Sequence, residues 1–202
     1  MDDLNRALSE ISDIRRQMAN ATVFRGYGPA TLALTGVFSL LAAAGQAIWL
    51  PDPSRAIGTY LAIWIITAVA SAAVIAIQTV NRTERIHSGL ADEMIHQAVE
   101  QFLPAVGGGA MLTFVLVHAA PSAVWMLPGL WQIIFSLGVF ASCRFLPRPM
   151  AAAGLWYMLA GLATIALGDS RALSPWTMGT SFGVGQMLVA GVLFRNGARD
   201  DG

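Results

Sequence analysis

The chain has 202 residues, of which 55% are hydrophobic and only 12% are charged, and its twelve basic and twelve acidic side chains balance to a net charge of zero. A soluble domain carries about 25% charged residues, so this chain has too few ionic groups to keep the surface of a globule in water. The balanced charge gives no basic surface for nucleic acid, and the single cysteine excludes an internal disulfide.

Long runs without a charged side chain divide the chain into candidate membrane spans. A charge at the centre of a bilayer costs about 2.5–3.5 kcal/mol, and a spanning helix needs about 20 apolar residues. One run, residues 101–143, is long enough for two helices and contains Pro121, which suits the first turn of a new helix. We therefore predict an all-α integral membrane protein, a bundle of six spans arranged as three hairpins, at 29–50, 56–80, 102–119, 122–143, 149–168 and 172–194.

The distribution of arginine predicts how the spans are oriented. All twelve basic residues are arginine, and with the N-terminus in the cytoplasm only Arg55 and Arg171 lie on the other side of the membrane. Cytoplasmic loops are enriched in basic residues, so both termini are predicted to be cytoplasmic. No cleavable signal peptide is expected, because the first apolar run has the length of a span. These features are typical of a multi-pass protein of the bacterial cytoplasmic (inner) membrane.

The polar segments predicted in the cytoplasm are residues 1–28, the connection 81–101 and the tail 195–202. Apolar residues recur at three- and four-residue spacing in 2–22, and every four residues in the connection, which predicts two amphipathic helices. Such helices lie in the lipid headgroup layer, pack on each other or bind a partner protein. The side chains that would contact a partner are Leu4, Ile11, Ile14, Met18, Ile86, Leu90 and Met94.

Glycine and proline in the third and fourth predicted helices indicate a candidate ligand or pore site. The glycine triplet 107–109 follows Pro104 by one turn and is predicted to unwind easily, because each Gly costs a helix about 1 kcal/mol relative to Ala. A proline inside the fourth helix predicts a kink. Broken helices line substrate sites in several transporter folds, but close helix packing alone also explains such residues. The candidates are Gly107, Gly108, Gly109, His118, Pro128, Trp131 and Gln132.

Small residues at regular spacing predict close helix packing. Where lipid supplies no hydrophobic driving force, small side chains let two helix backbones approach each other. We therefore expect a tight bundle and a homo-oligomer. The stripes are Gly154, Gly161 and Gly168 in the fifth predicted helix, Gly179 and Gly183 in the sixth, and Ala68, Ala72 and Ala76 in the second.

No sequence pattern indicates an enzyme. The predicted spans carry no Asp, Glu, Lys or Arg away from their ends, and Asp92, His96 and Glu100 share one face of a single helix, which cannot surround a metal ion. We expect no catalysis, no cofactor and no metal. Two functions stay open. The chain is either a regulatory, sensory or assembly partner acting through its cytoplasmic amphipathic helices, or a channel or facilitator for a small neutral or lipid-like solute.

Overall fold

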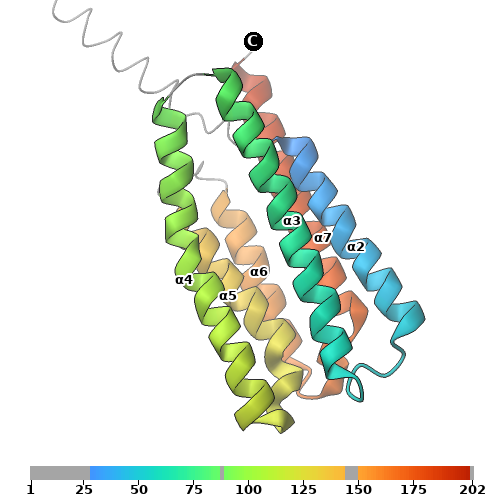
Figure 1. The fold of residues 1–202 in the computed structure, drawn as a ribbon. Helices are drawn as coiled ribbons and strands as arrows, with labels where there is room; N and C mark the ends of the chain where they lie inside the picture. The colour runs from blue at the N-terminus through green and yellow to red at the C-terminus, as the bar shows by residue number, and fades with distance from the viewer. Residues whose placement is uncertain (1–27, 87–88, 144–149, 201–202) are drawn as a thin grey trace, which may run out of the picture.

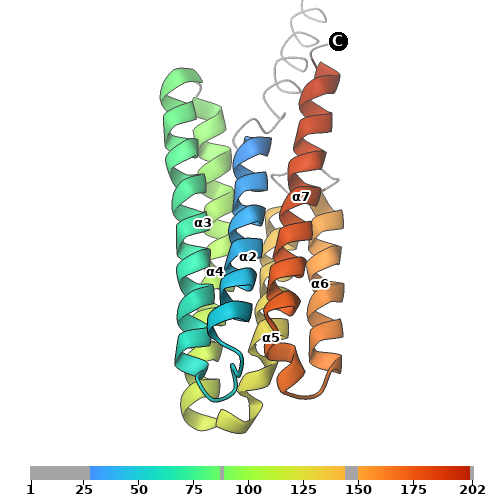
Figure 2. The same cartoon turned by 90° about the vertical axis from the view of Figure 1, so that its right-hand side faces the viewer.

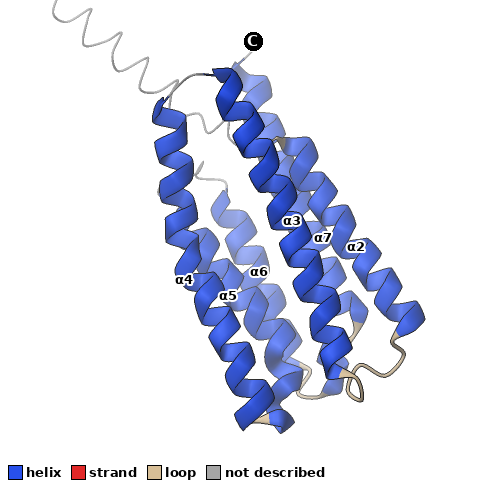
Figure 3. Cartoon of the chain, in the orientation of Figure 1, coloured by secondary structure: helices blue, strands red, loops and turns tan. Residues whose placement is uncertain are grey.

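The computed structural model describes residues 28–86, 89–143 and 150–200, and all the regular structure in these ranges is helical (Figure 3). This confirms the all-α prediction. Two short 3₁₀ helices, labelled η, lie among the α-helices. The elements are α2 (Pro29–Trp49), α3 (Ile57–Ile86), α4 (Gly89–Ala119), η1 (Pro121–Met126), α5 (Leu127–Ser142), α6 (Met150–Ala166), η2 (Ser170–Leu173) and α7 (Pro175–Asp200).

The helices form a bundle in which neighbours follow the order α3, α2, α7, α6, α5, α4 (Figures 1 and 2). The pairs α2–α3, α4–α5 and α6–α7 are joined at one end, which we call the loop end and which lies at the bottom of Figure 1. The most extensive contacts are α2 with α7 and α5 with α6, so the hairpins pack mainly on one another. Over the described residues α3 and α4 make little contact with each other, although they are consecutive.

Five helices are long and apolar enough to cross a membrane, so the chain is a multi-pass membrane protein by length and composition. The candidate spans are Pro29–Trp49, Ile57–Gln78, Val99–Ala119, Pro121–Ser142 and Pro175–Arg195. The remaining apolar helix, α6, has 17 residues. At 1.5 Å per residue it is about 26 Å long, slightly less than the hydrocarbon core of about 30 Å.

Helix boundaries differ from the predicted ones where polar sequence follows an apolar span. Residues 81–101 are not a separate amphipathic helix, because α3 continues to Ile86 and α4 already begins at Gly89. Likewise α7 runs to Asp200 instead of ending at residue 194. Backbone hydrogen bonding propagates at little cost once a helix is formed, so helix-compatible polar residues extend each span.

The breaks predicted in the third and fourth helices are not found in the structure. Helix α4 is continuous through Pro104 and the glycine triplet 107–109, and so does not unwind there. In a bilayer no water competes for the backbone hydrogen bonds, which stabilises the helical state of glycine. Pro128 does not kink a long helix. Residues Pro121–Met126 form the 3₁₀ helix η1, and Pro128 stands in the first turn of α5, where it removes no helical hydrogen bond.

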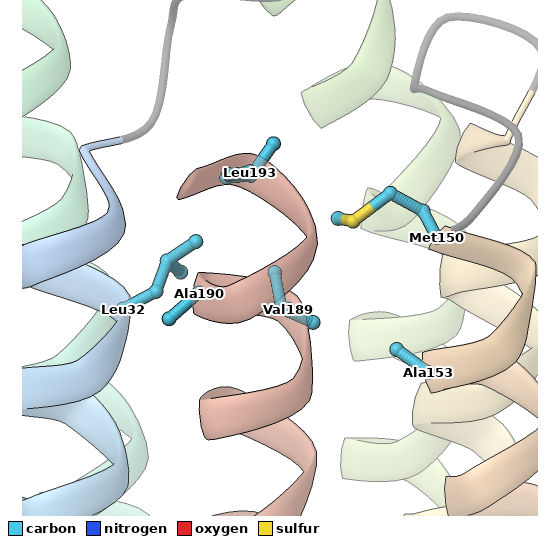
Figure 4. Packing of buried hydrophobic residues seen from close by; sticks show 6 residues of the cluster. All are labelled: Leu32, Met150, Ala153, Val189, Ala190 and Leu193. Carbon is cyan, nitrogen blue, oxygen red and sulfur yellow. The ribbon is translucent and has the colours of Figure 1, made fainter. Parts of the chain in front are cut away.

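Two buried apolar clusters stabilise the bundle. The cluster distant from the loop end is aliphatic, and in Figure 4 side chains of α7 lie between those of α2 and α6. Its members are Leu32, Met150, Ala153, Val189, Ala190 and Leu193. The loop-end cluster is richer in aromatic side chains and consists of Ala43, Leu50, Tyr60, Trp64, Leu173 and Met178.

Glycine permits the closest helix contacts, as predicted for most of the stripes. A Cβ added to Gly161 of α6 would lie 2.6 Å from the carbonyl oxygen of Gly129 in α5. One added to Gly183 would lie 3.0 Å from Leu40 of α2. The prediction was wrong for Gly168, which is exposed in a turn with a φ of +74°. The Ala68, Ala72 and Ala76 stripe does not pack in the bundle, since all three residues are exposed on α3.

Candidate functional site

Gln46 connects three elements at the loop end of the bundle. Its side-chain Nε2 donates a hydrogen bond to the carbonyl oxygen of Leu173 in η2 at 2.9 Å. Its Oε1 accepts one from the indole Nε1 of Trp64 in α3 at 2.8 Å. Gln46 is completely buried, so both hydrogen bonds are made out of contact with solvent or lipid. The amide therefore joins α2, α3 and η2 through groups that would otherwise be buried without partners.

Gln132 of α5 holds the next turn of the same segment. Its Nε2 donates to the carbonyl oxygen of Thr177 at 3.0 Å and lies 3.6 Å from the Met178 sulfur. This glutamine is also completely buried, and its Oε1 has no hydrogen-bond partner among the described residues. Two amides, one from α2 and one from α5, thus fix the segment from Leu173 to Met178, which contains the start of α7.

A second hydrogen-bonded contact joins α4 to α5. The indole Nε1 of Trp131 donates to the Thr113 hydroxyl at 2.8 Å. Thr113 in turn donates to the carbonyl oxygen of Gly109, one turn earlier in α4, at 2.7 Å. Because Gly109 would bring an added Cβ no closer than 3.9 Å to Ile134, the glycine is not required for this contact. The hydroxyl of Thr113 is the group that orients the tryptophan.

Aromatic rings surround this part of the bundle. Tyr60 is completely buried on α3 with its ring centroid 6.5 Å from that of Trp64, and its hydroxyl has no partner among the described residues. Further along the bundle, Phe135 contacts the rings of Tyr157 and Phe182 at 4.7 and 5.3 Å. An apolar and aromatic lining with a few fixed polar groups is typical of sites for small molecules.

The polar groups of this site are amides, hydroxyls and indoles, which bind neutral partners and do not transfer protons near neutral pH. Among the described residues no group of three or more His, Cys, Asp or Glu side chains could hold a metal ion. Ion pairs occur instead in the loops. Arg171 hydrogen-bonds to Asp169 at 2.9 Å and thereby lowers the pKa of that exposed carboxyl, and Arg55 pairs with Asp52 at 2.8 Å.

The predicted ligand or pore residues do not all meet at this site. Pro128, Trp131 and Gln132 lie together on α5, and the latter two make the contacts described above. Gly107 and Gly108 are exposed, with nothing within 4 Å of an added Cβ. His118 is exposed at the loop end of α4, with its Nδ1 2.9 Å from the carbonyl oxygen of Phe114. These last three residues therefore lie away from the network.

The structure describes only three of the seven predicted partner-binding residues. Leu4, Ile11, Ile14 and Met18 are outside the described residues. Ile86 is the last residue of α3, and Leu90 and Met94 fall in the first turns of α4.

Sequence reasoning missed most of the network. Gln46, Tyr60, Trp64 and Thr113 were not singled out, and neither was the segment that the two glutamines hold. An amide in a charge-free run was the available signal, and it applied to Gln46 as well as to Gln132. The carbonyl acceptors of Leu173 and Thr177 have no sequence signal, because every residue carries one.

Comparison with known proteins adds no assignment, since no protein-family model, no curated protein and no solved structure matches the chain.

Proposed function

We propose that the chain is a non-catalytic, six-span protein of the bacterial inner membrane that acts as a regulatory, sensory or assembly partner of another membrane protein. Both termini and the connection between α3 and α4 then lie in the cytoplasm. The partner contacts the amphipathic segment 2–22 and the apolar residues of the connection, Ile86, Leu90 and Met94.

The observation that supports this proposal is the combination of length and loose packing in α3 and α4. The two helices have 30 and 31 residues, or about 45 Å at 1.5 Å per residue, so each extends about 15 Å beyond a hydrocarbon core of about 30 Å. Only 11% of the α3 span and none of the α4 span is buried, compared with 33% for α2 and 44% for α7. They are the two spans with the fewest contacts to resist a displacement.

A rigid helix that continues from cytoplasm into bilayer transmits a displacement at one end to the other. A partner that binds near Leu90 would therefore shift α4 within the membrane and, through the Trp131–Thr113 hydrogen bond, act on α5. Loosely packed elements are those that move in regulatory transitions, because their movement breaks few contacts. The same coupling allows a change in the bilayer to be reported to the cytoplasmic side.

Photo-crosslinking in native membranes tests the proposed contact. With a photoreactive residue at position 90, we expect a discrete protein adduct that Met94→Asp and Ile86→Asp each reduce at least fivefold, because a buried charge opposes an apolar interface. Glu93→Gln is the matched control on the same helix and should leave the adduct unchanged. Adducts with lipid alone, or a protein adduct that neither Asp substitution reduces, would contradict the proposal.

Cysteine labelling tests the orientation. Ser54 is exposed in the loop between α2 and α3, so in a Cys143→Ser background Ser54→Cys should react with a membrane-impermeant maleimide added to intact spheroplasts. The wild-type chain, whose single Cys143 directly follows α5 at the end opposite its junction with η1, should react only after the membrane is permeabilised. The reverse pattern would place the termini outside the cytoplasm and remove the basis of the proposal.

A channel or facilitator for a small neutral or lipid-like solute is the second candidate function. The observation that favours this function is the hydrogen-bonded contact between Trp131 of α5 and α4, with Gln132 next to it. A transport site would lie at this contact. It predicts solute flux in liposomes that Gln132→Leu reduces. Gly108 would have no part in that pathway, since it is exposed and nothing lies within 4 Å of an added Cβ.

A further inference from the structure

We propose that the loop end of the bundle binds a small, neutral, mainly apolar molecule carrying one hydroxyl group. Its polar contacts are the Gln132 Oε1 atom and the Tyr60 hydroxyl, and the molecule is admitted by displacement of the η2 turn. The site is a binding site only, and it is independent of which function proposed above is correct.

Two unpartnered polar atoms carry this inference. Gln132 and Tyr60 are both completely buried, yet neither Gln132 Oε1 nor the Tyr60 hydroxyl has a hydrogen-bond partner among the described residues. Buried polar groups are nearly always paired, so each such atom requires an explanation. The adjacent polar atoms are satisfied: Gln46 uses both ends of its amide, and Gln132 Nε2 donates to Thr177.

Both atoms belong to the surroundings of one short segment. Gln132 contacts Thr177 and Met178 at the start of α7. Tyr60 packs in the same buried cluster as Met178 and Leu173. The residues that carry the two orphaned atoms therefore pack near the segment Leu173–Met178 from different helices, α5 and α3.

Their chemistry selects the ligand. An amide oxygen only accepts a hydrogen bond, whereas the Tyr60 hydroxyl can donate one, so a ligand hydroxyl has the right chemistry to pair with either atom. The surrounding side chains are apolar or aromatic, among them Trp64, Trp131 and Phe182, which suits an apolar body. A charged ligand is disfavoured because the loop-end cluster contains no Asp, Glu, Lys or Arg, and the nearby Arg171 and Asp169 are exposed and paired with each other.

The turn η2 is the part of the wall that can move. Both orphaned atoms lack accessible surface, so a ligand must displace protein atoms to reach them. Leu173 is buried in the loop-end cluster and belongs to a four-residue 3₁₀ helix whose first two residues, Ser170 and Arg171, are exposed. The side chain of Gln46 in α2 holds this turn in place by donating a hydrogen bond to the Leu173 carbonyl oxygen.

Methionine-methyl NMR of the full chain in lipid nanodiscs tests the site, with benzyl alcohol as the probe. Three methyl groups give three readings. Met178 contacts Gln132, Met150 reports folding from the other core cluster, and Met111 is 73% exposed on α4 and so reports partitioning into lipid. We expect the Met178 signal to shift saturably while the Met111 signal shifts linearly. Benzyl methyl ether, which accepts but cannot donate, should bind about tenfold more weakly.

Substitutions separate the site from non-specific partitioning. Gln132→Leu should lower the affinity for benzyl alcohol about tenfold and abolish its advantage over the ether, and Tyr60→Phe should weaken the alcohol as well. If the Gln132→Leu variant loses the native Met150 signal, it is not folded, and the Tyr60→Phe variant alone then tests the site. The proposal is overturned if Met178 follows Met111, if alcohol and ether bind the wild type equally, or if both variants bind like the wild type. None of these outcomes bears on the cytoplasmic crosslink.

Discussion

Gly161→Ala should strongly destabilise the bundle, by about 3 kcal/mol in the free energy of unfolding. The new Cβ would lie 2.6 Å from the carbonyl oxygen of Gly129 and 2.8 Å from Cγ1 of Ile133. The contact is reciprocal, because a Cβ on Gly129 would lie 2.7 Å from the carbonyl oxygen of Gly161. A backbone oxygen cannot rotate away as a side chain can, so α5 and α6 must separate.

The measurement is reversible unfolding in mixed micelles, with Gly108→Ala as the control. Gly108 is also a helical glycine, but nothing lies within 4 Å of its added Cβ. That variant should be neutral or more stable by about 0.5–1 kcal/mol, since Ala is the better helix former. Equal effects at the two positions would mean that α5 and α6 are not packed through these glycines.

The positions of the spans could be predicted because charge is excluded from the bilayer wherever the chain crosses it. The same reasoning could not predict which face of a span is buried. Lipid tails are as apolar as a protein core, so large hydrophobic side chains such as Met111 and Phe114 are 73% and 65% exposed. The completely buried side chains include Gln46, Gln132 and Ser136 instead. Apolar periodicity, which identifies the core of a soluble helix, therefore carries little information here.

The glycine positions show most clearly which contacts could not be predicted from the sequence. Gly107, Gly108 and Gly161 all lie within predicted spans and have the same intrinsic flexibility. The first two are exposed and the third touches a neighbouring backbone, a difference that depends entirely on the tertiary arrangement. Pro128, Trp131 and Gln132 are close in sequence and lie on one helix, whereas the partners of Trp131 on α4 and of Gln132 on α7 arise from contacts between residues distant in sequence.

Gln46→Leu should destabilise the loop end by about 2 kcal/mol, because it leaves two buried groups without partners, the Trp64 indole Nε1 and the Leu173 carbonyl oxygen. Hydrogen bonds between membrane helices contribute about 0.6 kcal/mol on average and up to about 1.7, so the two lost bonds and the residual desolvation together give this magnitude. Ala47→Leu, at an exposed position next along α2, introduces the same side chain toward lipid and should be neutral.

A double-mutant cycle with Trp64→Phe separates the hydrogen bond from the change in shape. Trp64→Phe removes the donor to Gln46 Oε1, so in its background the Gln46→Leu substitution leaves only the Leu173 carbonyl unpaired. The double variant should then be more stable than the sum of the single effects predicts, by about 0.5–1.5 kcal/mol. Strict additivity would show that the amide and the indole do not interact, and a neutral Gln46→Leu would show that η2 is not held by this glutamine.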